Sequence, residues 1–574
     1  MISTTNLSVQ FGKRILFDEV NVTFKKGNCY GIIGANGSGK STFLRILSGK
    51  LNPNSGNVIV ESNKRLSVLE QNQNEFDDYE TLKTTIMGNK DLYEIKKEMD
   101  DLYAKSDFND DDGVKVGELQ NRYEEMDGWN AESDAASLLS QLGVNEELHY
   151  TKMSDLDAKT KVRVLLAQAL FGNPDILIMD EPTNNLDFET IKWLENFLVN
   201  YENTVIVVSH DRHFLDSVCT HISDIDYGKI THYTGNYSFW YQSSQLALKQ
   251  RAQQNKKAEE KKKELEEFIS RFSANVAKSK QATSRKKMIE KLNIEEIKPS
   301  SRRYPGIIFD QDRESGDQIL TIENMNASPY FNDLNLILNK NDKLILFSKD
   351  SKITSSFYDI ILNNKIQSGS VRWGSTITKS FIPNDNDNFF DKDLNLIDWL
   401  RQWTNNDEER KEDYIRGFLG KMIFSGDEAL KSCKVLSGGE KVRCMLSKTM
   451  MKRSNFLLFD DPTNHLDLET ITALNNSLIK FKGNIILTTQ DYEFANSVGN
   501  RVLEIGPKGY IDKLMNFEDY LNDPKVKEQR DVIYWSLITA SCFLLTVLMI
   551  FSEIIFISLS LIVFSFELIE TEKE

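Results

Sequence analysis

The sequence predicts an α/β protein in which one domain occurs twice, with a helical linker between the copies and an apolar tail behind the second. Three observations predict this organisation: an internal repeat, short apolar runs that alternate with helical segments, and a lysine-rich stretch between the copies. The chain has 574 residues. One hydrophobic core rarely serves so many residues, so several packed units are expected.

The internal repeat has a constant spacing. KVRVLLAQAL at 161–170 recurs as KVRCMLSKTM at 441–450, and DEPTNNLDFETIKWL at 180–194 recurs as DDPTNHLDLETITAL at 460–474, both displaced by 280 residues. Self-similarity over this length indicates two copies of a whole domain. We therefore expect a first domain at 1–235, a linker at 236–300, a second domain at 301–525 and a tail at 526–574.

Each copy is expected to contain a sheet of short strands that alternate with helices. Apolar runs such as NCYGIIG at 28–34, KLILFS at 343–348 and DILIMD at 175–180 have the length of strands. The first copy holds 34 more residues between equivalent motifs than the second. This surplus lies within about 88–150, where apolar residues recur at helical spacing, so an inserted helical arm is expected.

The linker is the basic part of an acidic chain. The whole chain has a net charge of −16, whereas residues 249–298 hold fifteen Lys or Arg against eight Asp or Glu. The segment has almost no Gly or Pro, which predicts a long helical hairpin. Because proteins bind nucleic acid through Lys and Arg, we expect any RNA contact there. The candidates are Arg271, Lys278, Lys280, Arg285, Lys286 and Lys287.

Cysteine usage and the N-terminus indicate a compartment. The five cysteines are scattered and form no C-x-x-C pair, which argues against a disulfide framework and against a zinc site. The N-terminal residues show no basic segment followed by an apolar one. A reducing, cytoplasmic environment is therefore expected.

The clearest motif is a phosphate-binding loop. GANGSGKST at 34–42 follows an apolar strand and precedes a helical pattern. Its glycines let backbone N–H groups wrap phosphates, Lys40 would reach the β and γ oxygens, and Ser41 would bind Mg²⁺. Asp180 ends the strand ILIMD, where it would hold Mg²⁺, and Glu181 would orient the attacking water. The expected ATP-binding residues of the loop are Gly34, Asn36, Gly37, Gly39, Lys40, Ser41 and Thr42.

The combination of GANGSGKST, DEPTNNLD, SHD at 209–211 and LSGGEKVR at 436–443 resembles the ATP-binding cassette superfamily. Two cassettes on one chain and the basic linker between them resemble its ABC-F branch. The resemblance implies ATP hydrolysis with ATP and Mg²⁺ as cofactors, and action on the ribosome, with the linker beside rRNA and tRNA. It also implies that Phe11 stacks on adenine, that Gln71 senses Mg²⁺ and the attacking water, and that His210 contacts the γ-phosphate.

The resemblance further implies composite sites, in which the phosphate loop of one cassette meets the LSGGE signature of the other. The first site would thus also contain Ser437, Gly438, Gly439 and Glu440. The second site has lost its motifs: Thr354 replaces the lysine, Asn384 the glutamine, Asp461 the glutamate and Gln490 the histidine, and the partner signature reads LDAKT at 156–160. Since all losses fall in one composite site, we expect one hydrolytic site per chain and one structural interface.

The tail contains a long apolar run. Residues 532–552 are twenty-one residues without a charge, followed by Glu553 and a second apolar run to Phe566. About 20 apolar residues span a bilayer as a helix, so a membrane contact through 532–566 is expected. Lys525, Lys527 and Arg530 favour a cytoplasmic position for the preceding chain. The alternative is that the tail covers an apolar face of the second cassette.

Together these patterns predict a cytoplasmic, membrane-tethered ABC-F-type ATPase that binds the ribosome and modulates translation, by ribosome protection, as in antibiotic resistance, or by regulation. Because its cassettes would pair within the chain, a monomer is expected. Two alternatives stay open. One is a nucleotide-gated scaffold with incidental turnover, and the other is the ATPase subunit of an exporter, for which the sequence offers no second long apolar region.

Overall fold

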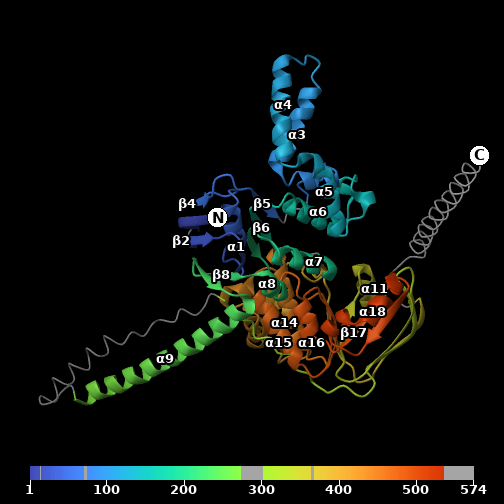
Figure 1. The fold of residues 1–574 in the computed structure, drawn as a ribbon. Helices are drawn as coiled ribbons and strands as arrows, with labels where there is room; N and C mark the ends of the chain where they lie inside the picture. Colours follow the sequence, from blue (N-terminus) through green and yellow to red (C-terminus); the bar gives the residue numbers. More distant parts are fainter. Residues whose placement is uncertain (13, 70–73, 185, 273–301, 364–366, 535–574) are drawn as a thin grey trace, which may run out of the picture. The chain divides into compact units, whose positions relative to one another are not determined.

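The computed structural model describes all residues except 13, 70–73, 185, 273–301, 364–366 and 535–574 (Figure 1). The described residues form two compact units. The first unit holds Met1–Gly306 together with His465–Ala473, and the second holds Ile307–Asn464 and the described part of Leu474–Glu574. Both units contain the same pair of sheets, so the repeated sequence corresponds to a repeated architecture.

The first unit is built on a three-stranded and a six-stranded sheet. The small antiparallel sheet has the order β2-β1-β4, and the large sheet has the order β5-β6-β7-β3-β8-β9. The strands of the large sheet run parallel, apart from β9, which pairs antiparallel with β8. The strands are β1 (Ile2–Phe11), β2 (Arg14–Phe24), β3 (Cys29–Gly34), β4 (Ser55–Val60), β5 (Leu66–Leu69), β6 (Ile176–Asp180), β7 (Thr204–Val208), β8 (His221–Asp226) and β9 (Lys229–Thr234).

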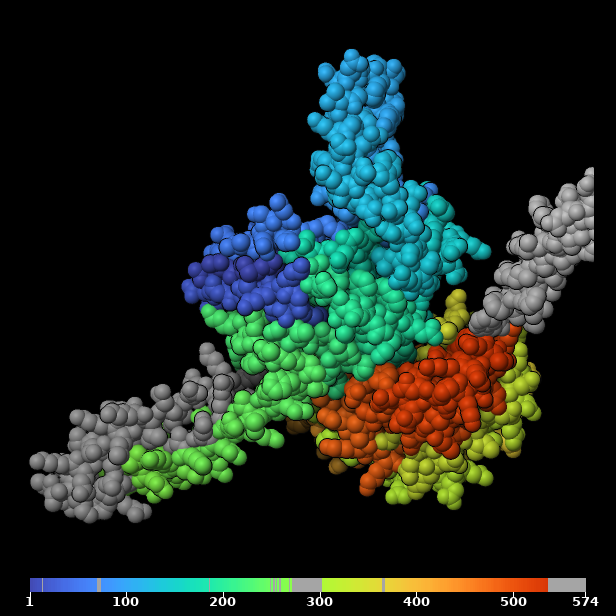
Figure 2. Space-filling view, in the orientation of Figure 1, coloured from blue at the N-terminus to red at the C-terminus, as the bar shows by residue number. Residues whose placement is uncertain are grey.

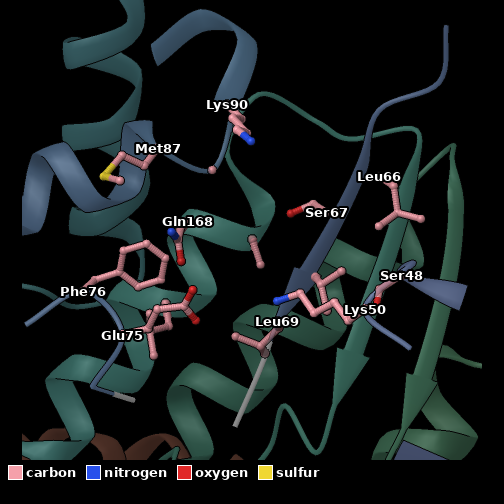
Figure 3. Close-up of a pocket in the computed structure, with 14 residues that line it drawn as sticks. Ser48, Lys50, Leu66, Ser67, Leu69, Glu75, Phe76, Met87, Lys90 and Gln168 are labelled. Carbon is pink, nitrogen blue, oxygen red and sulfur yellow. The ribbon is translucent and has the colours of Figure 1, made fainter. Parts of the chain in front are cut away.

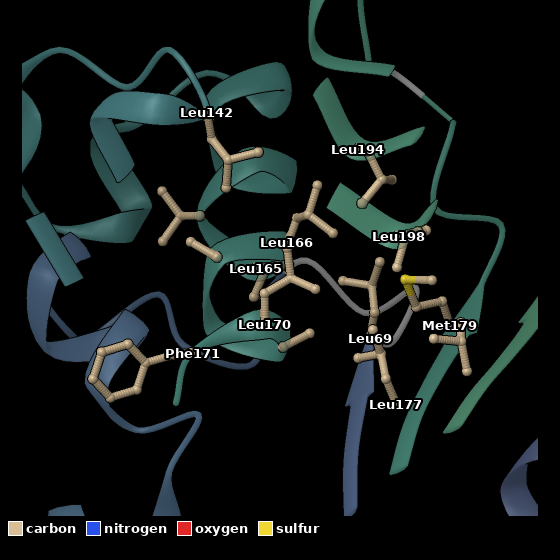
Figure 4. Packing of buried hydrophobic residues seen from close by; sticks show 14 of the residues in the cluster. Leu69, Leu142, Leu165, Leu166, Leu170, Phe171, Leu177, Met179, Leu194 and Leu198 are labelled. Atoms are coloured by element: carbon tan, nitrogen blue, oxygen red, sulfur yellow. The ribbon is translucent and has the colours of Figure 1, made fainter. Parts of the chain in front are cut away.

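Helices cover the large sheet because both of its faces are apolar. On one face, buried side chains of α1 pack against β3, β6 and β7. On the other face, Leu165, Leu166 and Leu170 of α6 pack near Leu194 and Leu198 of α7 (Figure 4). The helices of this unit are α1 (Lys40–Leu47), α2 (Thr81–Ile86), α3 (Lys90–Tyr103), α4 (Asp110–Glu125), α5 (Ala131–Gln141), α6 (Ala158–Leu170), α7 (Phe188–Val199), α8 (Arg212–Val218) and α9 (Tyr237–Phe272).

Helices α3 and α4 form an arm that projects from the first unit (Figures 1 and 2). Asn109 begins α4 with a capping box, in which its side chain accepts from the Asp112 N–H and the Asp112 side chain accepts from the Asn109 N–H. Leu92, Ile95 and Met99 of α3 are buried on the face that α4 covers. The arm lies within the segment where the sequence places the insertion.

The second unit has the same two sheets, ordered β11-β10-β13 and β14-β15-β16-β12-β17-β18. Its strands are β10 (Leu320–Ala327), β11 (Phe331–Leu338), β12 (Lys343–Phe347), β13 (Ser368–Trp373), β14 (Lys379–Ile382), β15 (Phe456–Asp460), β16 (Asn484–Thr488), β17 (Arg501–Gly506) and β18 (Gly509–Lys513). The helices in this half of the chain are α11 (Ser351–Asn363), α12 (Leu396–Arg401), α13 (Glu412–Lys421), α14 (Gly438–Lys452), α15 (Leu468–Lys480), α16 (Tyr492–Val498), α17 (Phe517–Asn522) and α18 (Pro524–Tyr534).

The linker begins with α9, a helix of 36 residues. At 1.5 Å per residue it extends about 54 Å. Arg271 is near the C-terminal end of this helix. The remaining RNA-contact candidates, Lys278, Lys280, Arg285, Lys286 and Lys287, lie outside the described residues, as does the expected return of the hairpin.

Helix α18 spans the position at which the sequence analysis separates the second domain from the tail. The boundary at residue 526 falls inside α18, where Val526 and Ile533 are buried against the second unit. In the first copy the equivalent chain is the unbroken start of α9, whereas Pro524 here ends one helix and starts another. The first residues of the apolar run, Val532–Tyr534, therefore belong to the second cassette.

No helix among the described residues is long and apolar enough to cross a membrane. The apolar run that suggested a membrane contact leaves the described residues after Tyr534. The predicted contact through 532–566 thus lies almost wholly outside them.

Helix α18 is held by a buried charge. Glu504 of β17 is fully buried, accepts a hydrogen bond from the Tyr520 hydroxyl at 2.6 Å, and pairs with the Arg530 guanidinium at 2.9 Å. A buried carboxylate needs such partners because its water has been removed. Replacing Arg530 with Met should therefore destabilise the second unit by about 3 kcal/mol or more.

Lys527 is exposed on the same helix, so Lys527→Met is the matched control and should leave the unfolding free energy nearly unchanged. Urea unfolding of the two variants, followed by an intrinsic fluorescence change, measures the difference. Equal stability of the two variants would show that α18 is not held by this pair.

Candidate nucleotide site

The first copy folds its glycine-rich motif into a phosphate cradle between β3 and α1. Gly37 and Gly39 have φ values of 75° and 103°, a left-handed conformation that glycine adopts without strain. A Cβ on Gly39 would also lie 2.9 Å from the Phe17 ring. The successive N–H groups of such a turn point inward at the start of a helix, which is the arrangement that binds phosphate.

The Lys40 side chain is fixed inside this loop by a hydrogen bond. Its side chain is largely buried, and its ammonium donates to the Gly34 carbonyl at 2.8 Å. Burial lowers the pKa of Lys40, opposed chiefly by attraction to Glu181. A bound phosphate would supply the anionic partner that this lysine lacks in the loop. Asn36 and Thr42, also expected in the cradle, lie in the same β3–α1 connection and first helical turn.

Strand register brings the acidic motif to the same edge of the sheet. Asp180 is paired with Val208, and Val208 with Ile32, two residues before the end of β3. The carboxyl ends of parallel strands form the edge where α/β proteins bind ligands. Asp180, Glu181 and His210 therefore gather beside the loop.

Asp180 and Ser41 fit a magnesium ion. The Ser41 hydroxyl hydrogen-bonds to Asp180, while Asp180 Oδ1 is buried without a hydrogen-bond partner among the described residues. Burial raises the pKa of Asp180, which a cation would reverse. A carboxylate and a hydroxyl are oxygen ligands of the kind that Mg²⁺ prefers. These two residues would hold the ion, and the ion would neutralise phosphate charge.

Glu181 and His210 form a buried pair at the expected position of the attacking water. The backbone N–H of His210 donates to Glu181 Oε2 at 3.1 Å, and the Nε2 atom of the His210 ring lies 3.3 Å from Glu181 Oε1. Burial raises the pKa of Glu181 to about 8 and, with Lys40 nearby, lowers the pKa of His210 to about 3. The histidine is therefore neutral at pH 7, whereas the Glu181 carboxyl is mostly protonated at that pH in this state and must lose its proton before it can act as a base.

The Phe11 ring is exposed enough for an adenine base to stack on it. Its ring is 54% exposed at the end of β1, and its partner across the β1–β2 hairpin is Arg14. The Arg14 guanidinium donates to the Gly37 carbonyl at 2.5 Å, which ties this hairpin to the phosphate loop. The sequence patterns do not mark Arg14, because an arginine fifteen residues before the start of β3 belongs to no motif.

Gln71 lies outside the described residues, but the flanking residues Leu69 and Glu75 line a cavity of about 460 Å³ (Figure 3). Gln168 of α6 lines the same cavity. The equivalent residue in the second copy is Lys448, whose ammonium lies 4.2 Å from the Phe389 ring centre and 4.0 Å from that of Trp403. The first copy thus has a neutral amide at this position, and the second has a lysine that contacts two aromatic rings.

The second copy does not form the phosphate cradle. Helix α11 begins at Ser351, the residue equivalent to Gly37, so the residues that would form the cradle are the first helical turn. Asp350 stands before that turn, and its carboxylate accepts from the Lys352 N–H at 2.9 Å. A protein carboxylate therefore already binds a backbone donor that a phosphate would need.

The acidic residues of the second copy are engaged as well. Asp460 accepts a hydrogen bond from the Thr488 hydroxyl at 2.7 Å. Asp461, like Glu181, has a positive φ and a buried carboxyl, and burial raises its pKa to about 7. Asn384 contacts the Asn464 amide at 3.4 Å, and Thr354 donates its hydroxyl to the Ser351 carbonyl at 2.9 Å. The second copy thus keeps the fold, but these described residues do not form the arrangement that would bind phosphate.

The signature motif begins helix α14 of the second unit. Ser437 is the N-cap, and its side chain and that of Glu440 form a capping box. Gly438 and Gly439 are the first helical residues, so the N-terminal N–H groups of α14 are accessible beside small side chains. In the first copy Asp157 is the N-cap of α6, which places a carboxylate where Ser437 has a hydroxyl.

This fold and this site define a tandem P-loop nucleoside triphosphatase of the ATP-binding cassette class. The family profile described as ABC transporter matches residues 17–184 and 333–464, and another profile with that description matches residues 223–309. The cassettes are thus ATP-binding domains of a class that hydrolyses ATP.

Similarity to curated proteins extends over nearly the whole chain. It is 51% identical over 540 residues to the Uncharacterized ABC transporter ATP-binding protein YkpA of Bacillus subtilis, covering 93% of this chain and 100% of that protein. It is 43% identical to the Probable ATP-binding protein YbiT of Escherichia coli O157:H7, covering 92% and 100%. It is 30% identical to ABC transporter F family member 2 of Arabidopsis thaliana, covering 90% and 78%. The chain belongs to the ABC-F family.

Solved structures support the tandem fold. The archaeal ribosome recycling factor aABCE1, in a complex with the ribosomal stalk protein aP1, matches with a TM-score of 0.56 at 15% identity, covering 92% of this chain and 99% of that one. The structure of RNase-L Inhibitor matches with the same TM-score at 14% identity and the same coverage. At this identity the match shows that the fold is shared.

Because the two copies differ in their phosphate loops, equivalent substitutions in them should change kcat by different amounts. Glu181→Gln should lower kcat by about 100-fold or more, because only the first copy joins its acid to a phosphate cradle. Asp461→Asn is the matched control and should change kcat little. Steady-state phosphate release measures both. A similar loss in both variants would mean that both copies hydrolyse ATP.

Proposed function

We propose that this protein is an ABC-F-type ATPase that binds the ribosome and modulates translation, with one hydrolytic site per chain. ATP binding at the first phosphate loop would close that loop against the Ser437 signature, and hydrolysis would release the closed state. The catalytic residues would be Glu181, His210 and Gln71. The cassettes would pair within the chain, so the protein would act as a monomer.

The observation that carries the single-site proposal is the difference between the two phosphate loops. In one copy positive-φ glycines form a cradle next to a buried lysine. In the other copy the same positions are helix, and Asp350 caps them. A carboxylate at a phosphate position repels nucleotide by charge as well as by occupancy.

The observation that supports a ribosomal partner is the basic linker. Helix α9 contains the first part of residues 249–298, a segment with a net charge of +7 in a chain whose net charge is −16. A long helix with excess Lys and Arg suits rRNA or tRNA phosphates. One protein with the same fold, aABCE1, is a ribosome recycling factor whose structure was solved with a ribosomal stalk protein, which is consistent with this proposal.

The alternatives make different predictions about turnover. A nucleotide-gated scaffold would bind its partner with unchanged ATPase rate, and an exporter subunit would not bind ribosomes. Cosedimentation with purified ribosomes, with and without ATP, together with ribosome-stimulated phosphate release, separates the three. Ribosome binding that needs ATP and raises turnover would support the proposal, and failure to cosediment would overturn it.

Charge reversal in the linker should weaken ribosome association. Changing Lys278, Lys280, Arg285 and Lys286 to Glu removes cations that would contact RNA phosphates. The slope of log affinity against log salt concentration should become shallower by about 0.7–0.9 for each lost contact. Cosedimentation over a salt series measures this slope.

The matched control reverses four exposed lysines of the second cassette, namely Lys340, Lys434, Lys482 and Lys508. This variant has the same net charge as the linker variant, so a general charge effect would weaken both equally. Affinity that falls equally in both variants would contradict a specific role for the linker.

The apolar tail is proposed to tether the protein to a membrane on its cytoplasmic side. A chain cut after Tyr534 keeps α18 and its contacts, whereas a cut after Arg530 would remove the buried Ile533. The chain ending at Tyr534 should therefore stay soluble with full ATPase activity, while the full chain floats with vesicles in a density gradient. A full chain that stays unbound as a monodisperse monomer without detergent would rule out the tether.

A further inference from the structure

A histidine and a glutamate join the two helices that follow the acidic and histidine motifs of the first nucleotide site. The Nδ1 atom of His213, in the first turn of α8, lies 2.9 Å from Oε1 of Glu195 on α7. The Glu195 side chain is 4% exposed, and that of His213 is 29% exposed. We call these two residues the α7–α8 pair.

Glu195 needs this contact because its carboxylate is buried. A carboxylate that has lost its water requires hydrogen-bond donors or a cation. Lys192 Nζ lies 3.6 Å from the other oxygen, Oε2, but the lysine side chain is 68% exposed and belongs to α7 itself. The hydrogen bond to Glu195 raises the pKa of His213, so this ring carries more positive charge at neutral pH than an ordinary histidine. His213 thus reaches the buried acid from a second helix.

Helix α8 is joined to His210 by a short capped turn. Asp211 is the N-cap of α8, and its carboxylate accepts from the Phe214 N–H at 3.1 Å. The Asp211 N–H in turn donates to the Ser209 hydroxyl at 3.0 Å. These bonds make residues 209–214 one compact turn, so a shift of α8 moves the backbone of His210 with it.

The same turn holds the catalytic carboxyl. The backbone N–H of His210 donates to Glu181 Oε2 at 3.1 Å, so the position of the turn also sets the position of that side chain. A group that acts on a reacting atom has to be held to within about 0.5 Å. A continuous set of contacts therefore runs from Glu195 through His213 and the turn at 209–214 to Glu181.

The second copy joins the same two helices without a charged pair. The residues equivalent to Glu195 and His213, displaced by 280, are Asn475 and Glu493. There the Ser497 hydroxyl donates to Asn475 Oδ1 at 2.8 Å and connects α16 to α15 through neutral groups. Both copies thus tie these helices together, but the α7–α8 pair belongs to the copy that forms the phosphate cradle.

We infer that His213 and Glu195 are positioning residues for ATP hydrolysis, which hold α8 where His210 and Glu181 meet in the geometry that the reaction needs. The pair lies outside the phosphate loop, so it acts on the chemical step and leaves nucleotide binding unchanged. The inference rests on the proposed hydrolytic roles of Glu181 and His210.

Steady-state phosphate release by the full chain tests this inference. His213→Ala should lower kcat by about tenfold and leave the KM for ATP within about twofold, because the phosphate loop stays in place. His213→Asn should restore kcat to within about threefold of the unchanged chain, since an amide N–H can replace the ring Nδ1–H. A rise in KM as large as the fall in kcat, or no rescue by Asn, would contradict a positioning role.

Two control variants separate positioning from stability. Lys192→Met removes the exposed lysine beside the same carboxylate but keeps the contact between the helices, so kcat should be unchanged. Asn475→Ala breaks the equivalent contact of the second copy, so it should lower the unfolding temperature while kcat stays unchanged. If Asn475→Ala lowers kcat as much as His213→Ala does, a general loss of stability explains both and the inference fails.

A double variant keeps the test decisive if His213→Ala folds poorly. Glu195→Gln combined with His213→Ala leaves no buried charge without a partner, so the chain should fold and show the same fall in kcat. Unchanged kcat in this folded double variant would overturn the inference.

Glu181→Gln, measured alongside, distinguishes this inference from the proposed function. If Glu181→Gln keeps full activity, the proposed hydrolytic site is wrong and the inference falls with it. If Glu181→Gln loses activity while His213→Ala keeps it, the site stands and only the role of the α7–α8 pair is refuted.

Discussion

The turn between β3 and α1 is the constraint on which the rest of the molecule depends. Its backbone enters the left-handed region at Gly37 and Gly39, and the Phe17 ring leaves no room for a Cβ at Gly39. Only this turn aims the N–H groups, Lys40 and Ser41 at one point. The second copy shows the alternative: without those glycines the same positions become helix, and Asp350 takes a backbone donor.

Burial sets the chemistry around that turn. The same loss of water that raises the pKa of Glu181 to about 8 also lowers the pKa of His210 to about 3. It places a neutral histidine beside a carboxyl that can gain or lose a proton near neutral pH. It also makes Arg302 depend on the carboxylates of Asp224 and Glu469.

Much of this organisation could be predicted from the sequence, and the reason is strand register. Asp180, Glu181 and His210 each follow an apolar run, and parallel strands bring such ends to one edge. The early start of α11 could not be predicted, because SKDSKITSS is compatible with both a loop and a helical turn until Asp350 caps one of them.

The long-range contacts could not be predicted either. Arg302 meets Asp224 and Glu469 across 78 and 167 residues, and no spacing pattern marks such a cluster. The pair between Arg530 and Glu504, which holds α18 against the second unit, has no mark in the sequence either. Composition shows where apolar sequence begins, but a buried partner decides where a domain ends.

The number of nucleotides bound per chain tests the central claim most directly. Isothermal titration of the Glu181→Gln chain with ATP and Mg²⁺ should give one ATP per chain, since only the first copy forms a phosphate cradle in the described residues. The same titration of Lys40→Ala should give none. Two ATP per chain, or one retained in Lys40→Ala, would contradict the account.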